Sequence, residues 1–306
     1  MSYRFKERES TEDAVKRIAL QQLDEALELT KAKTSFDEAV HDVRVCFKKL
    51  RGLIRLVRDE LGKETYQREN RFYRDINRAL SEVRDTAALL EIFEKLTKRF
   101  SEELNDDAFP LFRKSISAAK RIRQAEKKRA LVKVRKSIAT AHNRAKRWSI
   151  KSDDFPTVGK GLLRTYRRGK GGFDRAYDRQ TVPAFHEWRK DTKYFWYHIK
   201  LVRELWPAQL KDFAGEIKDL VDYLSDDHDL ALLRKQALKQ SRKAKDGHQY
   251  EALLALIDKR RAELETRACF LGQRIYAEES KAFSDRFHEY WRAWHAEEKI
   301  DPIAAT

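Results

Sequence analysis

Two stretches of the chain carry a histidine followed by arginines and lysines at steps of three and four residues. In the first stretch this row consists of His41, Arg44, Lys48, Arg51, Arg55 and Arg58. Residues at this spacing share one face of a helix, and no acidic residue interrupts the row over about five turns. Guanidinium groups donate paired hydrogen bonds to phosphate, and ammonium groups supply compact positive charge. Such a row therefore indicates the binding of a polyanion.

Each member of this row directly follows an apolar residue. The apolar set consists of Val40, Val43, Phe47, Leu50, Ile54 and Val57. Because one residue step turns about 100° around a helix, the cations lie directly beside the apolar stripe. The pattern predicts an amphipathic helix over 37–61 whose apolar stripe faces the core and carries a continuous cationic stripe next to it.

The second stretch begins about 145 residues later and repeats the same order of residue types. Its corresponding residues are His186, Arg189, Lys193, Lys200 and Arg203. Trp196 is the one departure, because it occupies the position that Arg51 has in the first stretch. The segments 80–85 and 224–229 also match each other, with Leu-Ser at the start and Asp at the end. We interpret both matches as an internal duplication of a four-helix unit.

Glycine and proline are rare, with 10 and 5 in 306 residues, which favours long uninterrupted helices over a turn-rich β fold. Prolines and breaks in periodicity predict eight helices, at 10–33, 37–61, 63–98, 109–149, 157–178, 183–205, 208–243 and 249–297. We therefore expect an all-α protein made of two pseudo-symmetric four-helix bundles, the first formed by 1–150 and the second by 151–306.

The composition is strongly basic, since 66 Lys and Arg exceed 50 Asp and Glu and give a formal net charge of +16. This excess favours phosphate-bearing polyanions as partners. No apolar run of about 18 residues is present, so no membrane span is expected. The start of the chain lacks the apolar segment of a secretory signal, and the cytoplasm is the expected compartment. Cys46 and Cys269 are too few for a disulfide framework or a thiolate zinc site.

Several segments together resemble the CHAD family, the conserved-histidine α-helical domains. His41–Arg51 is similar to the first motif of that family, and His186–Tyr197 is similar to its second motif. Gly161–Lys170 resembles the Arg- and Tyr-rich helix before the second motif, and 80–85 and 224–229 resemble its two Leu-Gly…Asp segments, with serine in place of glycine. The resemblance implies two helical bundles around a basic cavity and an association with inorganic polyphosphate. Some members of the family are fused to triphosphate-processing domains.

The expected function is non-catalytic binding of inorganic polyphosphate, and targeting to polyphosphate granules is one role that such binding would serve. A linear polyphosphate has no bases to stack, so its receptor needs many cations held at fixed positions. The residues expected to bind it are His41, Arg44, Lys48, Lys49, Arg51, Arg55, Arg74, Arg135, Arg164, Tyr166, Arg167, Arg168, His186, Arg189, Lys190, Lys193, Tyr197, Lys200 and Lys218. Weaker candidates on the helix expected at 109–149 are Arg121, Lys128, His142 and Lys146.

Three other interpretations of the basic rows stay open. They are RNA or DNA binding, an accessory subunit of an enzyme that processes polyphosphate or triphosphate, and a scaffold for acidic proteins. Single-stranded nucleic acid needs exposed aromatic platforms, whereas Trp188 and Phe195 fall on apolar stripes. The glycines at 169–172 lack P-loop spacing, and the His-Asp pairs at 41–42 and 228–229 do not make a metal site by themselves. We therefore expect no enzymatic activity, no metal and no cofactor.

Overall fold

The structure is a computed structural model, and it describes residues 3–31, 36–81, 85–104, 109–120, 124–242 and 248–297. Every regular element in these ranges is helical, which confirms the predicted all-α class. The α-helices are α1 (Thr11–Leu29), α2 (Phe36–Leu56), α3 (Arg58–Leu61), α4 (Lys63–Ser81), α5 (Asp85–Arg99), α6 (Pro110–Lys120), α7 (Gln124–Ala145), α8 (Phe155–Arg179), α9 (Val182–Leu201), α10 (Pro207–Ser241), α11 (His248–Ile275) and α12 (Ser280–Glu297). A short 3-10 helix, η2, spans Arg203–Leu205. Within the described ranges, no helix combines the length and the apolar character that crossing a membrane requires.

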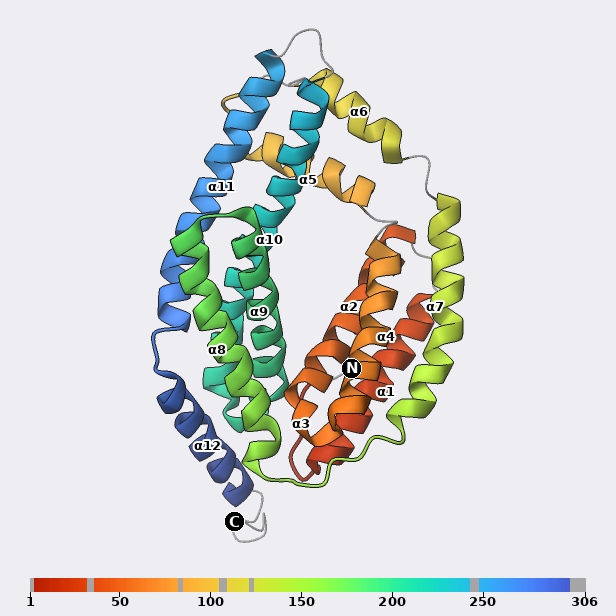
Figure 1. Cartoon of the computed structure of the whole chain (residues 1–306), viewed down its shortest axis with the longest axis vertical. Coiled ribbons are helices and arrows are strands. Elements are labelled where there is room, and N and C mark those ends of the chain that lie inside the picture. The colour runs from red at the N-terminus through yellow and green to blue at the C-terminus, as the bar shows by residue number, and fades with distance from the viewer. Residues whose placement is uncertain are drawn as a thin grey trace, which may run out of the picture.

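The helices α1, α2, α4 and α7 pack against one another around the apolar stripe of α2 (Figure 1). Val43, Phe47 and Leu50 of that stripe are fully buried. Glu69 of α4 is also fully buried, and it accepts hydrogen bonds of 2.8 and 2.9 Å from the guanidinium group of Arg144 on α7. The sequence therefore predicted correctly which face of α2 points inward.

The helices α8, α9 and α10 pack as a second group, with α11 along α10 and α12 against α8. Aromatic side chains fill this core, and the ring of Tyr166 on α8 stacks on Phe283 of α12 with centroids 4.0 Å apart. Trp188 and Phe195 of α9 are both fully buried. The apolar positions of the second motif thus serve the core, as the sequence predicted.

Four of the predicted helices were wrong in extent, because each is two separate helices in the structure. The stretch 63–98 forms α4 and α5, with 82–84 outside the described residues, and 109–149 forms α6 and α7, with 121–123 outside them. Likewise 249–297 forms α11 and α12, and 37–61 forms α2 and α3 with a non-helical turn at Val57 (φ −98°, ψ 24°).

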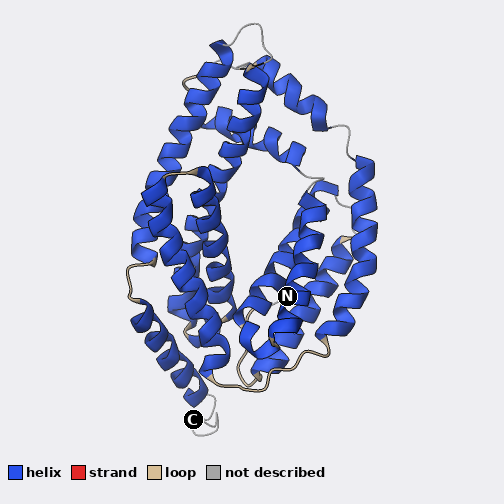
Figure 2. Ribbon diagram, viewed as in Figure 1, coloured by secondary structure: helices blue, strands red, loops and turns tan. Residues whose placement is uncertain are grey.

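Helix α5 packs on α10 and α11 rather than continuing the first group, and α6 packs on α5 and contacts Tyr250 of α11 through Phe112. They contribute Phe93 and Phe112 to a second apolar cluster, which Leu233 and Leu253 complete from α10 and α11. Figures 1 and 2 show the result as a ring of helices, in which α5 and α6 connect the far ends of the two groups. The internal duplication and the division at residue 150 stay predictions.

The two groups meet where α2 contacts both α8 and α9, and glycines allow the close approach. A Cβ atom added to Gly161 of α8 would lie 1.9 Å from the carbonyl oxygen of Leu56. The imidazole Nε2 of His198 on α9 lies 3.0 Å from the carbonyl oxygen of Gly52 on α2. Burial lowers the pKa of His198 to about 3, so its ring is neutral and donates to that carbonyl from Nε2. This junction fixes how α2 and α9 face each other.

Candidate functional site

The basic rows of α2 and α9 lie on sides of the two helices that face each other. The guanidinium groups of Arg51 and Arg55 on α2 lie over the ring of Tyr194 on α9, with 5.8 and 4.3 Å from their central carbon atoms to the ring centroid. Asn70 of α4 accepts hydrogen bonds from both arginines through Oδ1, at 3.2 and 3.3 Å. A ring face and an amide thus hold the two guanidinium groups without neutralising their charge.

Farther along the same faces, Lys193 of α9 lies among cations from three helices. Burial is the largest cause that lowers the pKa of its ammonium group to about 8. The positive charges of Arg189, Lys218 and Arg44 lower this pKa further, and only Asp222 among the leading causes raises it. Helices α9, α10 and α2 therefore each bring a cation close to Lys193, and this arrangement costs folding free energy.

Trp196, the departure from the repeated row, supports two lysines of this region. The Nζ atoms of Lys200 and Lys218 lie 4.8 and 5.9 Å from centroids of the indole of Trp196. The pKa of Lys200 is lowered by burial, and then by the positive charges of Lys49, Arg203 and Lys218. The tryptophan thus takes the place of one cation and positions two others.

We use the name basic cluster for the cations that line these facing sides of α2 and α9, with one more from α10. The basic cluster consists of Arg44, Lys48, Lys49, Arg51, Arg55, Arg189, Lys193, Lys200 and Lys218. Lys218 is paired with Asp222, and Arg189 has Asp227 and Asp229 nearby. Positive charges nevertheless dominate, because like charges account for the lowered pKa values of both Lys193 and Lys200 after burial itself.

The histidine of the second row, His186, pairs with a histidine that was not among the expected site residues. The Nδ1 atoms of His186 on α9 and His228 on α10 lie 3.1 Å apart. Burial and the charge of Arg189 lower the pKa of both imidazoles, that of His228 to about 3. Both rings are thus neutral at pH 7. His41, the expected counterpart of His186, is exposed on α2.

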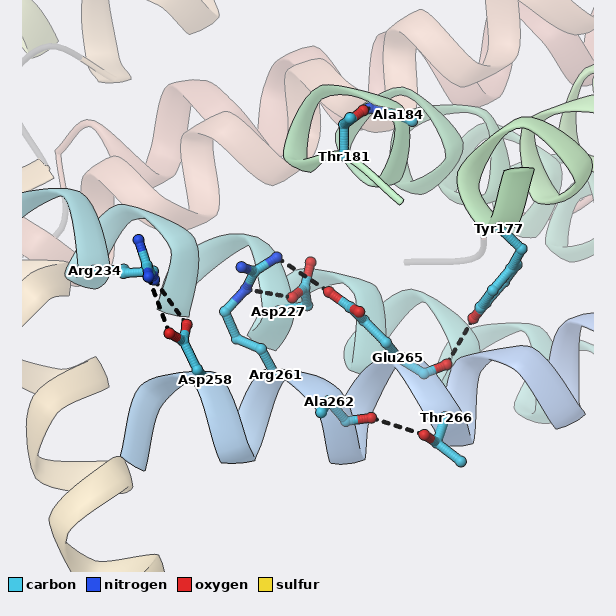
Figure 3. Close-up of polar contacts among 10 residues, drawn as sticks. All are labelled: Tyr177, Thr181, Ala184, Asp227, Arg234, Asp258, Arg261, Ala262, Glu265 and Thr266. Atoms are coloured by element: carbon cyan, nitrogen blue, oxygen red, sulfur yellow. Dashed lines mark hydrogen bonds and ion pairs between the residues drawn. The ribbon is translucent and has the colours of Figure 1, made fainter. Parts of the chain in front are cut away.

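The acidic residues beside His228 form ion pairs with arginine. Figure 3 shows Arg261 of α11 donating from Nε to Asp227, at 2.8 Å, and from Nη2 to Glu265, at 3.1 Å. Burial and the charge of Asp227 raise the pKa of Glu265. Among the residues that the structure describes, no group of three or more His, Cys, Asp and Glu side chains has the arrangement of a metal site.

Several expected site residues are engaged elsewhere. The hydroxyl group of Tyr166 donates to the carbonyl oxygen of Glu278 at 2.6 Å, and Tyr197 is buried against Tyr3. Arg135 donates to the carbonyl oxygen of Thr30, at 2.8 Å, just beyond the end of α1. These three side chains serve the packing between helices.

The remaining expected residues lie on the surface near these helices. Arg74 pairs with Asp75 and Lys190 pairs with Glu187, while Arg167 is exposed on α8. Arg164 and Arg168 point from α8 to carboxylates of α3 and α9. Among the weaker candidates, His142 lies 3.4 Å from Asp24 and Lys146 is exposed. Arg121, the side chain of Lys128, and Arg84 of the first Leu-Ser segment lie outside what the structure describes.

Tyr194, Asn70 and His228 were not predicted as site residues from the sequence. Tyr194 had a usable signal, because it lies one turn after Lys190 on the face that continues the row. Asn70 had none, since a single amide on an exposed-looking helix does not indicate which arginines it will meet.

A sequence model described as the CHAD domain matches residues 15–238 of the chain. No curated protein matches the chain.

Proposed function

Because the chain belongs to the CHAD domain family, which is linked to polyphosphate and triphosphate binding, we propose that it binds inorganic polyphosphate at the basic cluster without catalysing a reaction. The observation that carries this proposal is Lys193, whose pKa is lowered to about 8 by burial and by cations from three helices. A protein that holds like charges together at a cost in stability needs a compensating ligand, and a chain of phosphates supplies the opposite charge at close intervals.

Polyphosphate suits the basic cluster because its cations are held at fixed positions by neutral neighbours. Tyr194 and Asn70 position two arginines, and Trp196 positions two lysines. The side-chain entropy of these long residues is therefore partly lost before binding, which favours the association. We propose that the protein lies in the cytoplasm and that this binding targets it to polyphosphate granules.

Nucleic acid is the second candidate, and the aromatic rings beside the basic cluster argue against it. The ring of Tyr194 has two guanidinium groups over it, and the indole of Trp196 has two ammonium groups near it. Phe270 is 61% exposed, but it lies on α11, which contributes no cation to the basic cluster. Single-stranded nucleic acid would need free ring faces on which bases stack. An accessory role beside a polyphosphate- or triphosphate-processing enzyme is compatible with the same binding.

A competition assay tests the proposed function. Labelled long-chain polyphosphate is bound at roughly 0.15 M salt and challenged with unlabelled polyphosphate, RNA, DNA and heparin at equal charge concentration. We expect unlabelled polyphosphate to displace the label at least about tenfold more effectively than the other polyanions, because matched charge spacing adds to general electrostatic attraction. Equal displacement by RNA would instead favour nucleic-acid binding.

The affinity for polyphosphate is expected to fall as the pH rises, through Lys193. Its pKa near 8 leaves the ammonium group mostly charged at pH 7 and mostly neutral at pH 9. Since the polyanion binds the charged form, the affinity should decrease about tenfold between pH 7 and pH 9. Titrations at constant ionic strength between pH 7 and 9 would measure this, and Lys193→Arg should remove the dependence. A flat wild-type profile would contradict the prediction.

A further inference from the structure

A small pocket lined by four arginines lies beside the basic cluster, between α8 and the end of α2. Its arginines are Arg55, Arg58, Arg164 and Arg168, and it contains no lysine. Tyr66 and Tyr194 form part of its wall, and Gly161 and Thr165 contribute the surface of α8. The cavity encloses about 20 Å³, which is room for one small group.

The carboxylates near this pocket do not match its four guanidinium groups. Asp59 is shared between Arg58 and Arg164, and Arg168 lies 2.8 Å from Asp191. Burial alone would raise the pKa of Asp59, but hydrogen bonds from the two arginines hold it below its ordinary value. Among the described residues, Arg55 donates a hydrogen bond to the neutral amide of Asn70 and to no carboxylate. Positive charge therefore remains in excess in the pocket.

Two hydrogen-bond donors in the arginines of this pocket are unused. Nε of Arg55 and Nη1 of Arg164 are buried and have no hydrogen-bond partner among the residues that the structure describes. A buried N–H group that makes no hydrogen bond is unfavourable, and guanidinium groups are especially suited to phosphate oxygens. The pocket thus has the donors of an oxyanion site and lacks acceptors for two of them.

The pocket is continuous with the basic cluster and lies where the helices close together. Arg55 and Tyr194 belong to the pocket lining, and Arg51 of the basic cluster lies over the same tyrosine ring. Beyond the pocket, α8 touches the backbone of Leu56 at Gly161, so there is no passage for a chain between α8 and α2 at this point. A phosphate chain that follows the basic cluster to this junction has to end there.

We propose that this arginine pocket binds the terminal phosphate of a polyphosphate chain, an inference that rests on the proposed function. A terminal phosphate carries close to two negative charges at neutral pH, whereas an internal phosphoryl unit carries about one. The excess positive charge, which arises because the pocket has more guanidinium groups than carboxylates, matches the larger negative charge of the terminal phosphate. The pocket is blocked where α8 meets the backbone of Leu56, so a chain that enters between the two helices cannot continue past it, and the group at the block is a chain end.

The test compares two polyphosphate preparations of equal length, one with free ends and one with both ends blocked as phosphoramidates. Internal charges are the same in both, so a difference in affinity reports the recognition of ends. We expect the free-ended polymer to bind wild type about tenfold more tightly by calorimetry, as the extra charge-assisted hydrogen bonds require. Equal affinity of the two polymers would contradict the binding of terminal phosphates in the arginine pocket, and it would leave the proposed function intact. Failure of both polymers to bind would overturn the proposed function itself.

Two variants assign the end preference to the pocket. Arg164→Gln should abolish the difference between the polymers, since Asp59 keeps Arg58 as its partner and no carboxylate is left unpaired. Asp59→Asn should widen the difference, because it frees both arginines for the ligand. Arg292→Gln on α12, whose guanidinium group pairs with Glu289 on the surface, is the matched control for lost charge and should keep the difference. An Arg164→Gln protein that loses affinity for both polymers equally would overturn the inference, as would an Asp59→Asn protein that shows no change.

A third arm separates the ends of polyphosphate from other terminal phosphates. Linear tripolyphosphate has two free ends, and ATP presents one terminal phosphate on a nucleoside. We expect tripolyphosphate to displace the free-ended polymer at least about tenfold more effectively than ATP, because the basic cluster beside the pocket offers cations to further phosphates, and the nucleoside of ATP carries no negative charge for them. Equal displacement would overturn the assignment of the pocket to polyphosphate ends.

Discussion

Removing four lysine charges from the basic cluster is expected to weaken the binding of long-chain polyphosphate at least about 100-fold at roughly 0.15 M salt. The replaced residues, each changed to glutamine, are Lys48, Lys49, Lys200 and Lys218. Each ammonium group that contacts phosphate releases counterions on binding, so the slope of log affinity against log salt should become shallower by about 3. None of the four side chains is fully buried, and the thermal midpoint should therefore stay close to that of wild type.

A second quadruple variant controls for the loss of net charge. It carries glutamine at four exposed lysines on other parts of the chain, namely Lys31, Lys151, Lys239 and Lys281. Both variants lose the same formal charge, so general attraction of the polyanion decreases equally in the two. Affinities and salt slopes measured side by side should differ strongly. If the control lost as much affinity as the basic-cluster variant, binding would depend on net charge and the cluster would not be the site.

The sequence predicted the fold class and the inward face of α2, because both depend on local periodicity. The apolar residues Val43, Phe47 and Leu50 recur at helical spacing, and any packing of that helix has to bury them. The extent of the long helices was not predictable in the same way. Phe93 of α5 belongs to an apolar cluster with residues of α10 and α11. The periodicity of 63–98 is equally compatible with one long helix that continues along α2, so it does not predict the separate helix α5. Where a helix stops depends on partners that are distant in sequence.

The site was predictable in its rows of cations and less so in its supporting residues. The repeated rows indicated that α2 and α9 carry the cations, and Lys193 indeed lies near Arg44 of the opposite helix. Tyr166 was placed in the site because 161–170 resembles the Arg- and Tyr-rich helix of the CHAD family and because its hydroxyl group could donate to phosphate. Its rotational position on α8 instead directs the ring to Phe283 and the hydroxyl group to Glu278, since the aromatic core beneath α12 offers the larger burial.

The close approach of α8 to α2 is expected to make Gly161→Ala one of the most destabilising single substitutions in the chain. The added Cβ atom would lie 1.9 Å from the carbonyl oxygen of Leu56, and this backbone atom at the end of α2 cannot move aside as the tip of a flexible side chain can. We expect a loss of at least about 3 kcal/mol in the free energy of unfolding, measured by urea denaturation monitored by circular dichroism. The same substitution should impair polyphosphate binding, because the junction sets how α2 faces α9.

Gly215→Ala on α10 is the matched control for this experiment. Gly215 is exposed in a helix, and a Cβ atom added there meets no atom within 4 Å. Alanine restricts the unfolded chain more than glycine does, so this variant should be more stable than wild type by about 0.5–1 kcal/mol. Both variants add the same methyl group to a helix, but the free energy of unfolding should fall in Gly161→Ala and rise in Gly215→Ala. The opposite signs separate the effect of the contact with Leu56 from the effect of helix propensity. A Gly161→Ala protein that also gained stability would mean that α8 and α2 lie farther apart than the junction requires, and the closed end of the arginine pocket would be lost with it.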